Sequence, residues 1–467
     1  MTHLMSNNGV SSAGSNDEKK SMASSNFAGL LNQRRGFLPL LVGDLVSTSG
    51  FAIFSAAINY LVYTTTNSAL SITYLGIASF LPTILIGLFA GAFVDRSNRR
   101  RVMITCDLSR ALIVTIIPIW MIAKGFDLAI VIAATLGINL FSTIFRPAAR
   151  SIMPQIIPSQ WIQDANGLMS AFESLVSSAS LALGGALIVA VGASLSLFYN
   201  SITYILSAVM IFLIMVPSSL SLSQPKEKLP NLNSNAIAAP SVSANAIAQS
   251  PQEVAGGLAA SGKKSFTSDV REGMSYMLQH RGILEMTLVA SSINFFISLS
   301  LNFLVVYTTK FLLVGGFVYG SMLASYTLGS TVGSLIIGRL NLFRYGGKAL
   351  IGANIIFGLS TLALILLHNV LFAGMMLFVT GFSIGLSNVL YISIIQTLVP
   401  GNLLGRIISV DEVGSYAAIP LAQVAGGLLI QTFGIAPDIE IAGAGLIVTG
   451  LVSIFLKDYR NLRVEKS

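Results

Sequence analysis

The sequence Gly91-Ala92-Phe93-Val94-Asp95-Arg96-Ser97-Asn98-Arg99-Arg100 is a short polar turn between two long apolar stretches, residues 69–94 and 102–123. A helix needs about 20 mostly apolar residues to cross the ~30 Å hydrocarbon layer of a bilayer. Both flanking stretches have that length. The turn is therefore predicted to join two membrane-spanning helices at one face of the membrane.

The residue types within this turn suit a gate. Gly91 would let a neighbouring helix approach closely, and Asp95 could receive hydrogen bonds from a helix amino terminus. Arg96, Arg99 and Arg100 could bind carboxylates across a helix interface and so hold one conformation shut. The competing interpretation is that the arginines only mark a cytoplasmic loop.

The composition of the whole chain agrees with a membrane protein. Of 467 residues, 54% are hydrophobic and 10% are charged, and the mean hydropathy is +0.78. A soluble domain carries about 25% charged residues, so a soluble enzyme, a nucleic-acid-binding protein and a disulfide scaffold are excluded. Cys106 is the single cysteine, which excludes an intramolecular disulfide.

Outward from the turn, twelve apolar segments are long enough to span a bilayer. Their length favours helices over the short alternating strands of a membrane barrel. The predicted spans are 37–63, 69–94, 102–123, 127–148, 163–190, 195–216, 282–308, 316–340, 347–368, 370–398, 405–432 and 438–456. The sequence thus predicts an all-α integral membrane fold of two six-helix bundles.

Basic residues fix the expected orientation. With a cytoplasmic amino terminus, 24 of the 27 lysines and arginines fall in cytoplasmic segments, as the positive-inside rule requires. The net charge of +8 is then a rim on one membrane face and not a nucleic-acid site. A multi-pass protein of the cell membrane with both termini in the cytoplasm is expected.

Polar segments divide the chain. A stretch near Ser265–Met277 is expected to form a short amphipathic helix within the linker between the bundles. The expected parts are a disordered tail (1–36), an amino-terminal bundle (37–216), a cytoplasmic linker (217–280), a carboxy-terminal bundle (281–458) and a short tail (459–467).

The two bundles are related in sequence. Residues 151–192 align without gaps with 393–434 at an offset of 242, and residues 59–66 match 302–310 at nearly the same offset. Repeats of six spans in equal orientation are typical of a duplicated transporter. Two such bundles can rock about a site at their interface, which would expose that site to one side of the membrane at a time.

The turn at residues 91–100 resembles the loop signature of the major facilitator superfamily, Gly–x3–Asp–Arg/Lys–x–Gly–Arg–Arg/Lys. Asn98 stands where the family often has Gly, and asparagine tolerates a left-handed turn. The second-half counterpart, residues 333–339, lacks the acid. The resemblance covers about 37–458 and implies twelve spans in two pseudo-symmetric bundles that work by alternating access.

Further stretches narrow the resemblance to one branch of the superfamily. Residues 106–111, 145–150 and 164–168 are similar to the exporters that include macrolide-efflux and enterobactin-exporter proteins. Antiporters of the superfamily often have Gly-Pro four residues before a Gly-Gly pair in span five. Here Gly184-Gly185 follow Ser180-Leu181, so the sign of coupling stays open.

Ionisable residues inside the spans are functional candidates, since burying a charge there costs about 2.5–3.5 kcal/mol on insertion scales. Asp44 lies roughly 9 Å into span one and could bind a proton or a cationic substrate, or else pair with Arg146 or Arg150. Glu173 is the deepest carboxylate and the first candidate for proton coupling. Its alternative role is a hydrogen bond to a neighbouring helix.

Other charged residues in the spans suit structural or gating ion pairs. Asp107 and Arg110 are three residues apart on one helix and can pair with each other. Asp411 and Glu412 are expected in the first turns of span eleven, where they either dock the Arg96–Arg101 cluster or cap the helix.

Polar and aromatic residues of spans one, four, seven and ten are candidates to line a cavity, with helix packing as the alternative for each. They are Phe51, Asn59, Asn139, Asn294, Asn302 and Asn388. The sequence holds no metal cluster, no nucleotide-binding loop and no Ser/His/Asp constellation. No cofactor and no enzyme activity are expected, and an ion gradient is the expected energy source.

Together these features predict a monomeric secondary transporter that exports a small amphipathic molecule, drug-like or siderophore-like. The export is expected to occur in exchange for protons. One alternative is a proton-coupled importer of a metabolite such as a sugar or an organic acid. A second is a non-transporting membrane receptor or assembly factor, whose signature would be a structured 217–280 loop.

Overall fold

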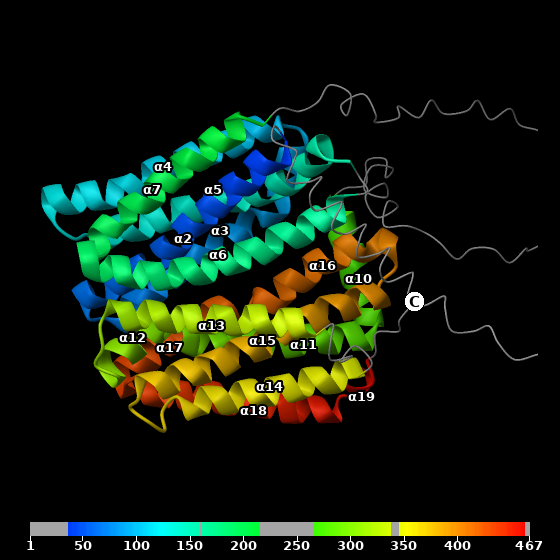
Figure 1. Ribbon diagram of the computed structural model, residues 1–467. Helices are drawn as coiled ribbons and strands as arrows, with labels where there is room; N and C mark the ends of the chain where they lie inside the picture. Colours follow the sequence, from blue (N-terminus) through cyan, green and yellow to red (C-terminus); the bar gives the residue numbers. More distant parts are fainter. Residues whose placement is uncertain (1–35, 159–160, 215–265, 338–344, 463–467) are drawn as a thin grey trace, which may run out of the picture.

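The computed structural model describes residues 36–158, 161–214, 266–337 and 345–462 of the 467. Within these ranges the regular structure is helical, and long helices run side by side in two groups (Figure 1). Each predicted span is helical over most of its described residues, which confirms the predicted fold class.

The first group consists of six helices from the amino-terminal half. They are α2 (Phe37–Thr66), α3 (Ala69–Asp95), α4 (Arg99–Lys124), α5 (Leu128–Ile156), α6 (Ile162–Val191) and α7 (Ala193–Phe212). In Figure 1 they occupy the upper part of the molecule. This group is called the N-half below.

The second group, called the C-half below, is less regular, because two of its spans are broken. Its elements are α11 (Arg281–Ser300), η2 (Leu301–Phe303), α12 (Leu304–Val306), η3 (Tyr307–Phe311), α13 (Gly316–Ile336), α14 (Gly346–Ala363), α15 (Val370–Leu398), α16 (Gly401–Tyr416), α17 (Ile419–Phe433) and α18 (Ile435–Phe455). Two short helices flank it, α10 (Phe266–Gln279) and α19 (Lys457–Arg460). α10 is the amphipathic helix expected near Ser265–Met277.

The broken spans correct the sequence-based boundaries. Span seven passes from α-helix through a 3-10 turn to a π-helical segment that ends at Phe311. Span eleven is interrupted between α16 and α17, just before Pro420, which cannot donate a backbone hydrogen bond. Hydropathy reports length and polarity and is insensitive to such local changes in helix type.

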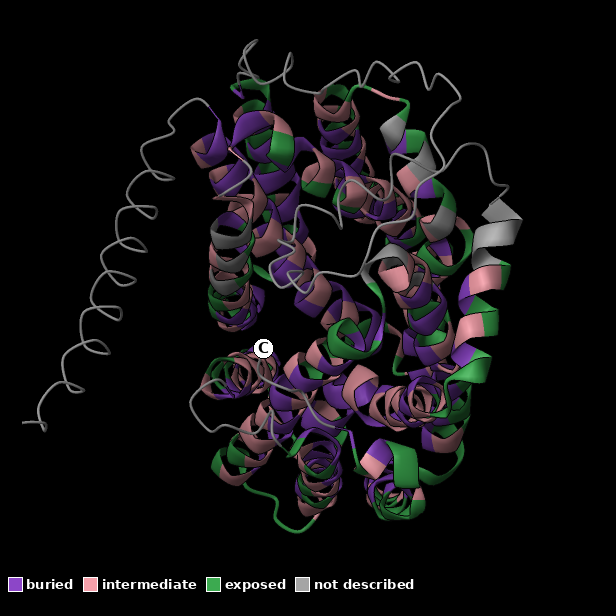
Figure 2. Ribbon diagram, turned by 90° about the vertical axis from the view of Figure 1, so that its right-hand side faces the viewer, coloured by how far each residue is buried: buried purple, intermediate pink, exposed green. Residues whose placement is uncertain are grey.

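Large apolar side chains cover the outside of the molecule. Leu112, Ile122, Leu371 and Phe455 are each more than two-thirds exposed, and Figure 2 shows buried positions on the inward faces of the helices. Among the described residues, eleven helical segments are long and apolar enough to cross a membrane. An outer apolar surface of this extent suits lipid and not water.

α13 is a helix of 21 residues that falls outside those eleven segments, because it is rich in glycine, serine and threonine. Its glycines explain the composition. A Cβ on Gly329 or Gly333 would collide with backbone carbonyls of α15, those of Phe378 and Phe382. Small residues let α13 pack directly on its neighbours, as is common between helices in membranes.

The helix bundle has two ends, the basic side and the far side. The basic side is where α2 begins and where the turn between α3 and α4 lies. The far side is where α2 ends at Thr66 and α13 begins at Gly316. α10 and α19 lie at the basic side, at the right of Figure 1.

On the far side the two halves are in direct contact. A Cβ on Gly320 of α13 would lie 2.5 Å from the Cα of Gly185 on α6. The rings of Tyr60 and Tyr319 stack with centroids 6.2 Å apart, and Thr73 Oγ1 donates a hydrogen bond to the backbone oxygen of Gln423 at 3.0 Å. The structure is therefore closed on the far side.

Candidate functional site

Two acidic residues that are 129 positions apart in the sequence meet inside the N-half. Asp44 is the eighth residue of α2, and Glu173 is the twelfth residue of α6. Their carboxyl groups lie within hydrogen-bonding reach of each other. Both side chains are half-buried, and Asp44 Oδ2 is inaccessible and has no hydrogen-bond partner among the described residues.

Helix packing explains why Asp44 faces Glu173. Gly43 and Gly50 bring α2 against α7, where a Cβ on Gly43 would lie 3.2 Å from the Cβ of Met210. Asp44 follows Gly43 by one residue, a rotation of about 100° around the helix. That rotation turns it from α7 toward α6, which also packs on α2.

The two carboxyl groups can form a hydrogen bond only if one of them carries a proton, because ionised carboxylates are acceptors only. Two negative charges at this distance repel each other in an apolar bundle. The pair is thus arranged to hold one proton or a cationic group between its oxygens.

A buried ion pair lies beside this site but does not neutralise it. Arg110 and Asp107 form a salt bridge on α4, and their side chains are 5% and 0% exposed. Ser207 Oγ donates to Asp107 Oδ2 at 2.8 Å. Arg110 is also held between the rings of Phe145 and Tyr204, each centroid 4.4 Å from its guanidinium carbon.

The ion pair that the sequence suggested is therefore formed. Both partners are within electrostatic reach of Asp44, but their charges cancel. Because Arg110 is paired with Asp107, it does not neutralise Asp44 or Glu173. The expected pairing of Asp44 with Arg146 or Arg150 is absent among the described contacts, and both arginines are exposed.

The C-half contains a different carboxylate centre. Asp411 is buried, and its Oδ1 accepts hydrogen bonds from Thr287 at 2.5 Å and from Tyr391 at 2.6 Å. The prediction that Asp411 and Glu412 lie in the first turns of their helix was wrong, since α16 begins at Gly401. Asp411 is committed to neighbours within its own half, and Glu412 is exposed.

The internal repeat relates these two centres. Thr287 stands 243 positions after Asp44, and Ser415 stands 242 positions after Glu173. Hydroxyl groups thus replace both acids in the second half, and Asp411 supplies the carboxylate from another position. Thr287 and Tyr391 were missed by sequence reasoning, although the offset alone points to Thr287.

The polar turn between α3 and α4 differs from its predicted arrangement. No neighbouring helix packs closely on Gly91 in this structure, since a Cβ on it would meet no atom within 4 Å. Asn98 has φ −74°, outside the left-handed region, and its side chain caps α4 by accepting from the backbone N–H of Arg101 at 3.1 Å. The side chain of Asp95 lies outside the described residues.

One arginine of this turn, Arg100, makes its described contacts within the N-half. Arg100 donates to the backbone oxygens of Ile211 and Phe212 at the carboxyl end of α7, and it lies over the ring of Phe212. Carbonyl groups at a helix end attract a cation. Arg96 is exposed and Arg99 is half-buried.

Three of the six predicted cavity-lining residues form hydrogen bonds with the backbone of their own span. Asn59, Asn139 and Asn302 each donate to the backbone oxygen four residues earlier, those of Ser55, Thr135 and Ser298. Asn294 reaches across to the backbone oxygen of Ser415 at 3.1 Å. Phe51 stacks on Phe54, and Asn388 is exposed.

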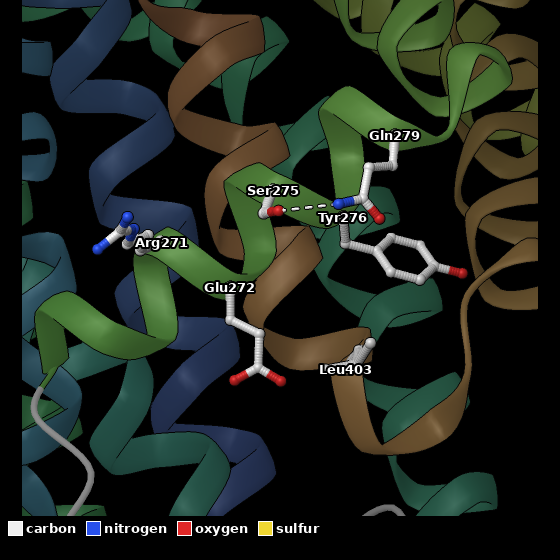
Figure 3. Close-up of a pocket in the computed structure, with 6 residues that line it drawn as sticks. All are labelled: Arg271, Glu272, Ser275, Tyr276, Gln279 and Leu403. Atoms are coloured by element: carbon white, nitrogen blue, oxygen red, sulfur yellow. Dashed lines mark hydrogen bonds between the residues drawn. The ribbon is translucent and has the colours of Figure 1, made fainter.

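A shallow hollow of about 410 Å³ lies at the basic side between α10 and α16 (Figure 3). Within α10, Gln279 donates to Ser275 at 3.2 Å, and Arg406 of α16 forms a salt bridge with Glu272 of α10 at 2.8 Å. None of the predicted site residues lines it. The salt bridge ties α10, the helix before span seven, to the basic-side end of span eleven.

Clusters that could hold a metal ion, with three or more His, Cys, Asp or Glu side chains, are absent from the described part of the chain. Two carboxyl groups such as those of Asp44 and Glu173 can bind and release a proton or a cation.

The chain resembles known transporters in sequence and in fold. The family model described as Major Facilitator Superfamily matches residues 40–423. The chain is 23% identical to the uncharacterized MFS-type transporter YfiS of Bacillus subtilis, with 94% of this chain and 98% of that protein covered. It is 20% identical to macrolide efflux protein A of Streptococcus pyogenes (93% and 99% covered) and 23% identical to the multidrug efflux pump Tap of Mycolicibacterium fortuitum (93% and 98%).

Solved structures share the fold. A bacterial homologue of the iron transporter ferroportin, in an inward-facing state, has a TM-score of 0.65 at 16% identity, with 91% of this chain and 99% of that chain covered. A bacterial homologue of the human lysosomal transporter Spinster, inward-facing and unoccupied, has a TM-score of 0.61 at 12% identity, with 92% and 98% covered.

Proposed function

The chain belongs to the Major Facilitator Superfamily, and we propose that this transporter exports a small amphipathic organic molecule in exchange for protons. The observation that carries the proposal is the meeting of Asp44 and Glu173, two carboxyl groups within hydrogen-bonding reach inside an apolar bundle. The substrate class takes further support from relatives named as macrolide and multidrug efflux proteins.

The proposed cycle uses the carboxyl pair as a competitive site. In the deprotonated pair, two negative charges favour a cationic or hydrogen-bonding substrate. Binding of a proton from the far side removes one charge, weakens substrate binding and releases the molecule there. Release of the proton toward the basic side restores the substrate-binding form.

The orientation is part of the same proposal. The distribution of basic residues supports a cell-membrane protein with both termini in the cytoplasm, and the far side would then face outward. With the far side closed, this arrangement would correspond to an inward-facing state. The protein is proposed to work as a monomer, since both carboxylate centres, Asp44–Glu173 and Asp411, lie within one chain.

Glu173→Gln is expected to abolish the acceleration of transport by an opposed proton gradient and to leave downhill flux measurable, because glutamine keeps the shape but cannot release a proton. The protein would be reconstituted in vesicles and assayed with a radiolabelled macrolide and a fluorescent organic cation. Glu440→Gln, which removes an exposed carboxylate of α18, is the matched control.

Proton-driven flux that survives in Glu173→Gln would contradict the assignment of this residue. The same vesicles discriminate direction: acceleration by proton and substrate gradients that point the same way would indicate a proton-coupled importer instead.

A further inference from the structure

A carboxyl group outside the described site is buried in an unusual way. Asp438 is the fourth residue of α18, on the far side, and it is 0% exposed. Both of its carboxyl oxygens are inaccessible and have no hydrogen-bond partner among the described residues. Its surroundings are apolar: a Cβ on Gly426 of α17 would lie 3.3 Å from Asp438 Oδ1 and within 3.2 Å of Phe303 and Leu299.

An ionised carboxylate is unstable in such a place, because it loses water and gains neither a donor nor a cation. The position in the first turn of a helix favours negative charge only modestly. A metal ion would need several oxygen ligands, and the three atoms nearest to a Cβ on Gly426 are one oxygen of Asp438 and two side-chain carbons. The far-side-closed structure therefore calls for the neutral, protonated acid.

Charged groups on the surrounding elements do not compensate Asp438. The elements packed on α18 are α11, α14, α17, α19 and η3, and none of their described side chains forms a hydrogen bond with the Asp438 carboxyl. On the far side, Tyr307 donates its hydroxyl to the backbone oxygen of Leu364, and His368, Lys310 and Glu440 are exposed. The charged groups toward the basic side are Arg281, Glu285, Lys348, Lys457, Asp458 and Arg460.

The same turn of α17 makes the contact between the two halves. Gln423 is 1% exposed, and neither atom of its amide has a partner among the described residues. A Cβ on Gly76 of α3 would lie 2.7 Å from this amide. One turn later Gly427 packs against Thr73. Asp438 thus lies directly behind the surface that closes the far side.

We propose that Asp438 is a second proton-binding site, which takes up a proton when the far side closes and releases it when the far side opens. Separation of α17 from α3 would let water reach Gln423 and Asp438, and water stabilises the ionised acid. This inference rests on the proposed alternating access, and it is independent of the Asp44–Glu173 pair.

The expected result is a pH-dependent closure of the far side. Spin labels on Thr65→Cys and Leu371→Cys, which are exposed far-side positions of the two halves, report the separation by double electron–electron resonance in lipid nanodiscs. Cys106 is buried and is replaced by serine. Because the closed state holds one more proton, the ratio of closed to open molecules should fall by up to about tenfold for each unit by which the pH is raised.

Asp438→Asn and the smaller Asp438→Ala should both remove this pH dependence and leave the far side closed. Glu440→Gln, on the same helix, and Glu173→Gln should both keep it. A wild-type separation that does not respond to pH, or a response that persists in the Asp438 variants, would overturn the inference. Failure of the proposed proton exchange would appear separately, as proton-driven flux that survives in Glu173→Gln.

Discussion

At the scale of single residues, the N-half separates charges that must stay paired from charges that can change. Asp107 and Arg110 are buried, bonded to each other and enclosed by Ser207, Phe145 and Tyr204. Asp44 and Glu173, beside them, interact with each other and have no ion-pair partner among the described residues. The first pair suits a fixed structural role, and the second suits the binding and release of an ion.

Arg110→Met is expected to destabilise the protein, because it leaves Asp107 as an unpaired buried charge. Removal of one partner from a buried ion pair typically costs about 3–5 kcal/mol. The midpoint of thermal unfolding in detergent should fall clearly, whereas Lys310→Met, which removes an exposed cation, should leave it nearly unchanged. The double variant Asp107→Asn/Arg110→Met should recover part of the loss, and a double variant less stable than Arg110→Met would argue against the pair.

At the scale of helices, close backbone packing holds the far side together. Gly185 and Gly320 let α6 and α13 touch, and a Cβ at either position would lie within 3 Å of backbone atoms of the other helix. Backbone atoms cannot rotate away as side chains can. The helices would have to move apart, and the two halves with them.

Gly320→Ala is therefore expected to shift the protein away from the far-side-closed state and to slow transport severalfold. Gly352→Ala and Gly374→Ala are matched controls, because a Cβ at either position would meet no atom within 4 Å. Spin-label distances across the far side, measured beside transport rates in vesicles, check both parts. An unchanged distance distribution in Gly320→Ala would show that this contact does not limit closure.

The same packing explains how far the sequence could lead. Long apolar runs predict the spans, because the bilayer demands both length and apolarity. Contacts between helices leave no such one-dimensional signal. The meeting of Asp44 with Glu173, the capping of α7 by Arg100 and the burial of Asp438 all depend on how helices are rotated against one another. The breaks in spans seven and eleven escape hydropathy for the same reason, since a distorted helix is as apolar as a regular one.

At the scale of the whole molecule, the two halves are unequal partners. The N-half carries a carboxyl pair at its centre, and the C-half carries Asp411 with hydroxyl donors and Asp438 near the far side. Rocking of the halves would change the environment of the groups near their contact surface most. That asymmetry underlies the proposed dependence of the movement on protons, with one proton-binding site in each half.

Alternating access makes a direct prediction for the far-side contact. Tyr60 and Tyr319 lie on opposite halves with their rings stacked there, so a covalent link between cysteines at these positions should hold the far side closed. In a Cys106→Ser background, Tyr60→Cys/Tyr319→Cys is treated in intact cells with a membrane-impermeant, reducible thiol cross-linker. Export should stop, and an impermeant reducing agent should restore it, because the far side is proposed to face outward. Each single-cysteine variant under the same treatment is the control, and export that continues in the cross-linked protein would be incompatible with rocking of the two halves about a central site.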